Sequence, residues 1–404
     1  MKKILIATVP EKGHVNPLIG TAQELVKLGA EVAFFAQRDI TPQLNAAKLF
    51  CKCYTPGKNT PEFVLPDEFI TSGELFAQKV KDKMWLRRWI KTLLIDCAEG
   101  QKAGIEAAVK DFEPDIMVCD PLSYAAAIVA EENGLVWAGV SNSLNPVTPD
   151  DWNCDLLETL RVYDSDRKRL FAKSKHDIKF KSSDVISPYL NIVFTCEEYA
   201  PRNLSGNNFS EYVGAPFNIT DFKRGDETDF PFDKFNPDKQ KVYMSLGSQL
   251  YYNPQLFITA YEALKGMNVQ LIFSVNELCT DEFKAIFPAD SIIERYTPQL
   301  QLLPHIDMMI SHGGANSVIE AQTFGVPLAL LPICNDQHLQ AMFMKNAGAG
   351  IVLDPNKPDA TEWRKAFETL LDKNSAYCQK ARAIKDTLSR LGGPQKAAKL
   401  IYKL

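Results

Sequence analysis

Residues 308–337 read MMISHGGANSVIEAQTFGVPLALLPICNDQ, and this stretch decides the fold. Its first four residues are an apolar strand that runs into a glycine-rich turn. A helix is expected over 316–324. The alternation then continues with elements predicted at 327–331 (strand), 338–346 (helix) and 350–353 (strand). Strict alternation of short apolar strands with helices is typical of βαβ units around a parallel sheet, so the fold class is α/β.

The same alternation occurs on both sides of this stretch. Before it, the pattern predicts strands over 241–246 and 269–274 with a helix over 254–265 between them. The chain also opens in this way, with elements predicted at 3–9 (strand), about 16–28 (helix) and 31–36 (strand). The sequence therefore predicts two separate α/β halves.

The two halves meet at a segment without periodicity. Residues 221–240 are rich in Asp, Lys, Pro, Phe and Gly, which is typical of a linker between domains. We expect an N-terminal domain over 1–220 and a C-terminal domain over 241–404. The helical segment 359–403, broken at Gly392-Gly393-Pro394, is long enough to return to the first domain.

Composition excludes several classes of function. The charge sum is 45 minus 50, or −5, so no positive field would attract nucleic acid. The nine cysteines show no zinc spacing and are expected to be reduced thiols. No apolar run reaches 18 residues, and the apolar segment at 3–9 is too short for a secretion signal. We expect a cytoplasmic protein.

The turn after the first strand, PEKGHVNP at 10–17, places His14 at the carboxyl edge of a parallel sheet, where open α/β folds bind ligands. The turn lacks the G-x-G-x-x-G pattern of dinucleotide-binding proteins. A histidine at this edge can act as a general base near neutral pH. The alternative is a loop histidine that caps the next helix.

A carboxylate follows another predicted strand. The segment PDIMVCDP at 114–121 places Asp120 at the same sheet edge, ahead of a helix predicted over 123–133. Asp120 can fix the tautomer of an imidazole and stabilise its charged form. On local evidence, a simple cap of the next helix is equally compatible.

Two glycine-containing loops in the second half suit an anion. In SHGGANS, at 311–317, glycines let peptide N–H groups approach a phosphate, and the following helix dipole favours negative charge. The segment VYMSLGS at 242–248 ends a strand with the same chemistry. Structural turns remain the alternative for each loop. Asp336 and Gln337 could read sugar hydroxyls, and the aromatic ring of Tyr296 could stack on a base.

These motifs resemble the family-one inverting glycosyltransferases of the GT-B fold, especially the bacterial branch that glucosylates macrolides and flavonoids. The stretch 296–350 is similar to the family's donor signature, with aromatic-x-P-Q, H-G-G-x-N-S-x-x-E, D-Q and G-x-G in order. The resemblance spans nearly the whole chain. It implies two facing Rossmann-like domains with parallel sheets and a C-terminal helix crossing back to the first domain.

The resemblance also implies roles for individual residues. His14 would be the base and Asp120 its partner. The donor would be bound by a larger group of residues. Tyr296 would stack on the base beside Gln299, Glu320 would bind the ribose, and Asp336 and Gln337 would bind the sugar. The diphosphate would be held by Ser248, His312, Gly313, Gly314, Asn316 and Ser317. Tyr296 stands where relatives often have Trp, which leaves uracil and thymine both open. Ala315 stands where a larger residue is common.

The implied reaction moves a hexose, with glucose expected, from a nucleoside-diphosphate sugar, with UDP expected, to a hydroxyl of an apolar small-molecule acceptor. No cofactor or metal is expected. Asp164-Ser165-Asp166 spells the D-x-D of metal-dependent transferases but lies in a charged run, which favours a solvated loop or helix.

The acceptor site is expected in the N-terminal half, where 84–94 mixes aromatic, aliphatic and basic residues within the segment 63–100. This stretch suits an apolar pocket wall, a peripheral membrane contact, or an ordinary amphipathic helix, which we favour. Rival functions are a sugar-nucleotide epimerase, a lipid-linked GlcNAc transferase, and a non-catalytic sugar-nucleotide-binding partner protein. The oligomeric state stays open.

Overall fold

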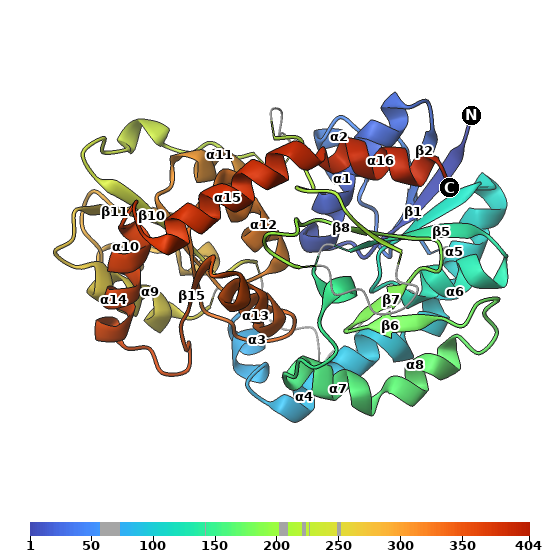
Figure 1. Ribbon diagram of the computed structural model, residues 1–404, viewed down its shortest axis with the longest axis horizontal. Coiled ribbons are helices and arrows are strands. Elements are labelled where there is room, and N and C mark those ends of the chain that lie inside the picture. The colour runs from blue at the N-terminus through green and yellow to red at the C-terminus, as the bar shows by residue number, and fades with distance from the viewer. Residues whose placement is uncertain (57–72, 142, 202–208, 220–223, 226, 249–251) are drawn as a thin grey trace. The chain divides into compact units, whose positions relative to one another are not determined.

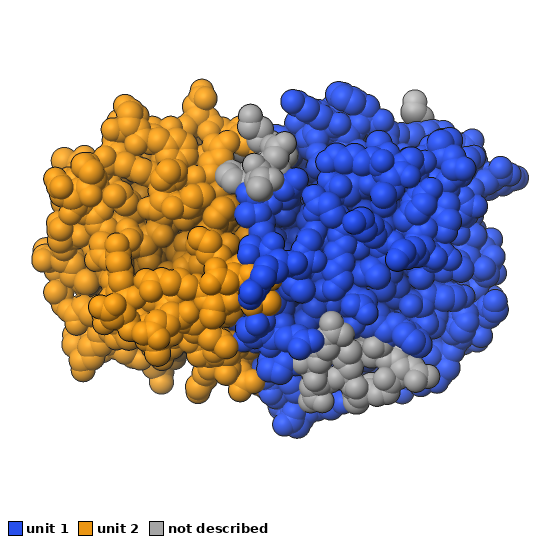
Figure 2. Space-filling model, turned by 45° about the horizontal axis from the view of Figure 1, so that its top comes forward, with its two compact units in different colours: residues 1–70, 83–226, 388–404 blue, residues 71–82, 227–387 orange. Residues whose placement is uncertain are grey.

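The computed structural model describes residues 1–56, 73–141, 143–201, 209–219, 224–225, 227–248 and 252–404. These residues form two compact units, coloured separately in Figure 2. Unit 1 comprises Met1–Ile70, Lys83–Asp226 and Leu388–Leu404, and unit 2 comprises Thr71–Asp82 and Glu227–Thr387, as far as they are described. Each unit has its own parallel sheet.

Unit 1 is built on a sheet in the order β3-β2-β1-β4-β5-β8-β9, in which every neighbouring pair is parallel. Strand β1 pairs with both β2 and β4, and its residues Ile4–Ala7 are fully buried, as expected for a strand covered on both faces. The strands are β1 (Lys3–Ala7), β2 (Glu31–Phe35), β3 (Lys52–Tyr54), β4 (Ile116–Cys119), β5 (Val136–Ser141), β8 (Leu190–Val193) and β9 (Ser210–Tyr212).

Helices and one hairpin complete unit 1. The hairpin pairs β6 (Lys179–Lys181) with β7 (Asp184–Ile186) in antiparallel fashion. The helices are α1 (Lys12–Lys27), α2 (Thr41–Ala46), α4 (Lys83–Lys91), α5 (Ala98–Phe112), α6 (Tyr124–Glu132), α7 (Asp155–Val162), α8 (Asp164–Leu170) and α16 (Gly393–Tyr402).

The last helix, α16, packs against α1 at the other end of the chain (Figure 1). Gly20 makes this approach possible, because a Cβ at Gly20 would lie 2.9 Å from Cγ of Pro394. Lys396 Nζ donates to the Tyr212 carbonyl oxygen at 2.6 Å and anchors the helix further. The C-terminal residues thus belong to the unit that the N-terminus begins.

Unit 2 is built on a second parallel sheet, in the order β12-β11-β10-β13-β14-β15. Its strands are β10 (Gln240–Ser245), β11 (Val269–Ser274), β12 (Ile292–Glu294), β13 (Met308–Ser311), β14 (Leu328–Leu330) and β15 (Gly350–Val352). Its helices are α3 (Gly73–Lys79), α9 (Pro254–Leu264), α10 (Asp281–Lys284), α11 (Gln299–Leu302), α12 (Ala315–Phe324), α13 (Gln337–Ala347) and α14 (Ala360–Leu371), while α15 (Ala376–Leu391) ends in unit 1.

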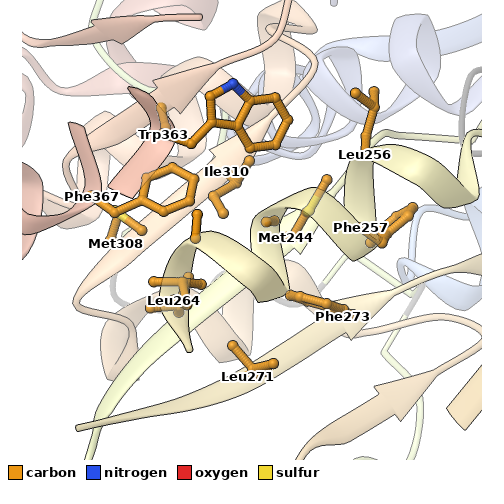
Figure 3. Close-up of a cluster of buried hydrophobic side chains, with 14 of the residues drawn as sticks. Met244, Leu256, Phe257, Leu264, Leu271, Phe273, Met308, Ile310, Trp363 and Phe367 are labelled. Atoms are coloured by element: carbon orange, nitrogen blue, oxygen red, sulfur yellow. The ribbon is translucent and has the colours of Figure 1, made fainter. Parts of the chain in front are cut away.

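The core of unit 2 is shown in Figure 3. Trp363 and Phe367 of α14 lie in one buried cluster with Met308 and Ile310 of β13, and none of the four is exposed. Burying such side chains contributes about 1.5–3 kcal/mol each. This core fixes the carboxyl ends of β10 and β13, where the glycine-containing loops begin.

The predicted fold class is confirmed, since both sheets are parallel and helices alternate with strands along the chain. The largest boundary error is at α1, which begins at Lys12 rather than near residue 16, and β1 ends at Ala7 rather than at residue 9. Pro17 therefore lies inside the helix, where its ring nitrogen has no N–H to donate. Residues 221–223 and 226 of the predicted linker lie outside the described residues.

Two further features concern the whole chain. The nine cysteines, all of which are described, form no disulfide. In the part of the chain that the structure describes, no helix combines the length and the apolar character needed to cross a membrane.

Candidate functional site

The first group of predicted site residues lies at the carboxyl edge of the unit 1 sheet. Strands β1 and β4 are parallel neighbours, with Ala7 opposite Cys119. Asp120 follows β4 directly, and His14 lies in the first turn of α1. Nδ1 of His14 lies 2.6 Å from Oδ2 of Asp120. Two residues separated by 106 positions in sequence therefore form a direct hydrogen-bonded pair.

Asp120 is buried, with 3% of its surface exposed, and three donors hold it. Besides His14, Thr8 Oγ1 donates to Oδ2 at 3.2 Å and the Leu122 N–H donates to Oδ1 at 3.0 Å. Burial by itself raises the pKa of the Asp120 carboxyl, but the charge and hydrogen bond of His14, with the other two donors, lower that pKa below its ordinary value. Asp120 is therefore ionised at neutral pH.

The ionised carboxylate determines the tautomer of His14. Because Asp120 can only accept, Nδ1 of His14 carries the proton and Nε2 has the lone pair of a neutral imidazole. The His14 side chain is 19% exposed, so it is not sealed in the core. This arrangement suits a general base, because the carboxylate at Nδ1 would stabilise the imidazolium that forms when Nε2 takes up a proton.

Helix capping does not explain the contacts of either residue. The N-cap of α1 is Glu11 and that of α6 is Ser123, and neither helix has a side-chain cap. The Asp120 carboxylate instead accepts from His14, Thr8 and the peptide N–H of Leu122. His14 and Asp120 therefore form a hydrogen-bonded pair and do not act as helix caps.

The second group lies in unit 2, at the ends of β10 and β13, which are parallel with Ser245 opposite Ser311. The loop after each strand contains a glycine with positive φ, +76° at Gly247 and +86° at Gly313. A Cβ at Gly247 would lie 2.7 Å from Cε1 of His312, and one at Gly314 would lie 2.6 Å from its Nε2. The imidazole of His312 therefore lies between the two loops, where any larger side chain would collide with it.

His312 is neutral in this position. Burial lowers its pKa to about 4, against an opposing effect of the Ser245 backbone. Its Nδ1 is buried and makes no hydrogen bond to the described residues. A buried polar atom without a partner calls for an explanation, and a ligand at the glycine-containing loops would supply one.

Helix α12 begins at these loops. Gly314 is its N-cap, and Asn316 and Ser317 lie in its first turn, where no acidic side chain occurs. Peptide N–H groups and the helix dipole make such an end favourable for an anion. Ser248 is exposed and follows Gly247 directly. The residues predicted to bind a diphosphate thus come from two adjoining loops and one helix start.

A buried network joins Gln299 to Glu320, behind the first turn of α12. Gln299 Nε2 donates to Glu320 Oε2 at 2.6 Å and to Ser317 Oγ at 3.4 Å. Its Oε1 accepts from the Tyr243 hydroxyl at 3.2 Å, which also bonds to Thr297 Oγ1 at 2.9 Å. The side chain of Gln299 therefore orients Glu320. Tyr296, the predicted stacking residue, is half-buried and precedes this network.

The predicted sugar-binding pair lies at the start of α13. Asp336 is its half-buried N-cap residue, and Gln337 is buried. Gln337 Oε1 accepts from the N–H groups of Ile333 and Cys334, at 2.9 and 3.1 Å, so the amide oxygen holds its own loop. A Cβ at Gly313 would lie 3.5 Å from the Gln337 carbonyl oxygen, so this loop adjoins the glycine-containing one.

Four residues in these groups were missed by sequence reasoning: Thr8, Tyr243, Thr297 and Asn335. Thr8 follows β1 and could have been found as a polar residue at the same edge as Asp120. Tyr243 and Thr297 are buried and carry no sequence signal of a polar network. Asn335 adopts a left-handed conformation, with φ +53°, directly before Asp336.

Two other predicted segments take ordinary structural roles. Asp164 and Asp166 begin α8, and their carboxylates pair with Lys168 and Arg169 of the same helix. On α4, Trp85 and Ile90 are buried while the surface ion pair Lys83–Asp155 joins the helix to α7. Residues 63–72 of the expected acceptor segment lie outside the described part.

Comparison with known proteins finds similarity to bacterial glycosyltransferases. Residues 262–404 match the family model described as the C-terminal domain of erythromycin biosynthesis protein CIII-like proteins. A protein of Bacillus subtilis named uncharacterized UDP-glucosyltransferase YdhE is 25% identical over 380 residues, covering 93% of this chain and 92% of that protein. The NDP-glycosyltransferase YjiC of the same species is 23% identical, covering 98% of this chain and 96% of that protein.

Solved structures share the fold over the full length. A glycotransferase of kitacinnamycin has a TM-score of 0.75 at 20% identity, covering 100% of this chain and 98% of that one. The calicheamicin glycosyltransferase CalG4 has a TM-score of 0.71 at 19% identity, with the same coverage. The two parallel α/β units of this chain thus have the GT-B fold of these glycosyltransferases, and the chain is similar over nearly its whole length to bacterial proteins named UDP-glucosyltransferase and NDP-glycosyltransferase.

Proposed function

We propose that the protein is an inverting glycosyltransferase that moves glucose from UDP-glucose to a hydroxyl of an apolar small-molecule acceptor. The observation that carries this proposal is the 2.6 Å contact between His14 Nδ1 and the ionised Asp120. That contact leaves Nε2 of His14 as the basic nitrogen, which an alcohol acceptor requires. The pair favours activation of an acceptor alcohol over epimerisation, which has no acceptor hydroxyl to deprotonate.

The proposed reaction is a single displacement. The acceptor oxygen forms a bond to the anomeric carbon as the bond from that carbon to the diphosphate oxygen breaks. The acceptor proton moves to Nε2 of His14, and the resulting imidazolium is stabilised by Asp120. Attack from the face opposite the leaving group inverts the anomeric centre.

The leaving diphosphate would be bound by the residues at the start of α12. The peptide N–H of Gly314 and the hydroxyl of Ser317 would supply hydrogen bonds to the developing negative charge. The N–H of Gly313 donates to Ser311 Oγ at 3.1 Å and holds the loop in place. Because burial keeps His312 neutral, it would bind as a hydrogen-bonding group rather than as a cation. We propose that no metal ion is needed for this step.

The identity of the donor is proposed from the remaining residues. Tyr296 would stack on uracil, Glu320 would bind ribose hydroxyls, and Asp336 with the Gln337 amide would bind glucose. The name UDP-glucosyltransferase of the relative YdhE supports this choice. Among the similar structures, the glycosyltransferase VinC is complexed with dTDP, so thymidine diphosphate is the main competitor to test.

The acceptor and the compartment are proposals as well. One relative is named 4'-demethylrebeccamycin synthase, and the kitacinnamycin glycotransferase has the same fold, which supports a natural-product acceptor. The absence of disulfides among the nine cysteines supports a reducing compartment, and we propose that the protein acts in the cytoplasm.

Calorimetric titration with UDP and with TDP tests the donor proposal. We expect tighter binding of UDP, and we expect transfer to persist in excess chelator. Tighter binding of TDP would contradict the choice of uracil, and strong rescue of transfer by added Mn²⁺ would contradict a metal-independent step. Proton NMR of the product gives the anomeric configuration, and retention of the donor's configuration would contradict the single displacement.

A further inference from the structure

A second buried carboxylate, Asp184, lies in unit 1 and has no part in the mechanism above. Asp184 begins β7 and is 2% exposed. Its Oδ2 accepts from Ser141 Oγ at 2.6 Å, and its Oδ1 accepts from Asn145 Nδ2 at 2.8 Å. Ser141 and Asn145 are themselves buried, so this carboxylate is held inside the protein by neutral donors.

The fold places Asp184 close to the His14–Asp120 pair. The peptide N–H of Val185 donates to the carbonyl oxygen of Pro121 at 3.4 Å, so each aspartate is the direct neighbour of one partner in this bond. Ser141, which binds Asp184, ends β5, and β5 pairs in parallel with β4, the strand that Asp120 follows. Asp120 and Ser141, the donor that binds Asp184, thus lie at neighbouring strand ends of one sheet edge.

Burying a carboxylate among neutral donors is costly, and two hydroxyls or an amide would hold the same loops at lower cost. The pKa of the Asp184 carboxyl is raised to about 7, and burial is the largest cause. The hydrogen bonds from Ser141 and Asn145 and the charge of His14 act to lower this pKa, whereas the charge of Asp120 acts to raise it. The titratable groups around it are His14 on α1, Asp120 after β4, and Tyr124 on α6 with its neighbour Arg167 on α8. Asp184 and the pair are therefore electrostatically coupled.

We propose that Asp184 is a positioning residue of the transfer reaction, whose buried negative charge adds to that of Asp120 and stabilises the imidazolium that forms on His14. The inference rests on the proposed function, because it assumes that His14 takes the acceptor proton. Asp184 does not touch the reacting atoms. The negative charge of Asp184 adds to the electrostatic potential at His14. Ionised Asp184 therefore makes His14 a stronger base.

The direct test is a pH titration of His14 in the Asp184→Asn variant, monitored by NMR of protein that carries isotopically labelled histidine. The His14 signal is assigned by its loss in His14→Ala. Removing the charge should lower the midpoint of the His14 titration by about 0.5–1 pH unit. The acid limb of kcat/KM should move to lower pH by a similar amount, with kcat/KM at pH 8 falling roughly 3- to 10-fold.

A merely structural role predicts a different result. Asp184→Asn would then lower the melting temperature and leave the His14 midpoint unchanged, which would overturn the proposal. The matched control is Asp111→Asn, which removes an exposed carboxylate of the same unit that pairs with Lys52 and should leave the His14 midpoint where it is. If Asp184→Asn does not fold, Ser141→Ala keeps the carboxylate, removes one donor and should produce a smaller shift in the same direction, and no shift there would also overturn the proposal.

The two failures are distinguishable, because the titration needs no substrate. If no nucleotide sugar is used by the protein, the proposed function fails whatever the titration shows. If transfer occurs and depends on His14, but the midpoint does not respond to Asp184, only this inference fails.

Discussion

Asp120→Asn is the substitution that tests the geometry of the histidine pair most sharply. It keeps the shape of the side chain but removes a negative charge whose Oδ2 lies 2.6 Å from His14 Nδ1. The carboxamide can also turn its NH₂ group toward Nδ1. His14 would then carry its proton on Nε2, the nitrogen that must accept the acceptor proton.

The size of the loss follows from the same contact. Two unit charges about 4 Å apart interact by roughly 4 kcal/mol at an effective dielectric constant near 20. The partial exposure of His14, 19%, reduces this. A loss of about 3–4 kcal/mol in the transition state corresponds to a fall in kcat of roughly 10²- to 10³-fold. The wrong tautomer would bring the loss toward the upper end.

The assay compares initial transfer rates to an unactivated alcohol and to an acidic phenol. Because a phenol that is already ionised needs no base, Asp120→Asn should slow transfer to it far less. The control is Thr8→Val, which removes one 3.2 Å hydrogen bond to Asp120 and leaves the histidine contact in place. That variant should lose only about fivefold. Equal losses with both acceptors, or a loss below threefold in Asp120→Asn, would refute the reasoning.

Two further predictions concern the glycine-containing loops. Gly314→Ala places a Cβ 2.6 Å from Nε2 of His312 and should weaken UDP binding by about tenfold or more in calorimetry, whereas Gly100→Ala, with no atom within 4 Å of the new Cβ, should leave it unchanged. Because burial lowers the pKa of His312 from 6.5 to about 4, the neutral form stabilises the fold above pH 6.5, and that contribution is lost as pH falls toward 4. His312→Gln should therefore flatten the fall in melting temperature over this range, and an unchanged slope would show that His312 is not the group responsible.

The elements of the fold that were predicted well are those whose position depends on one feature of the sequence. The strand expected at 269–274 has those bounds in β11, because a buried parallel strand is a short, mostly apolar run. The pair His14 and Asp120 was also predictable, since the ends of parallel strands meet at one edge. The start of α1 was not, because residues 10–17 were interpreted as a turn, whereas the helix begins at Lys12.

The buried polar contacts were beyond sequence reasoning for a physical reason. Asp184 lies on a three-residue strand of an antiparallel hairpin, which is too short to show a period, and its donors Ser141 and Asn145 lie about 40 positions earlier in the chain. The link from Tyr243 through Gln299 to Glu320 likewise joins three separate elements. Such contacts depend on side-chain placement in three dimensions, which composition and periodicity do not contain.

The central claim is that His14 activates an acceptor hydroxyl for transfer from a nucleotide sugar. The most direct measurement is mass spectrometry of the products formed from UDP-glucose and a panel of phenolic, macrolide and carotenoid-like alcohols, with His14→Ala run beside the wild-type protein. The account predicts glucosylated product with the wild type and a loss of roughly 10²- to 10⁴-fold in the variant. Near-normal transfer by His14→Ala to an unactivated alcohol would contradict it, and tight UDP binding without any transfer across a broad panel would instead indicate a sugar-nucleotide-binding protein.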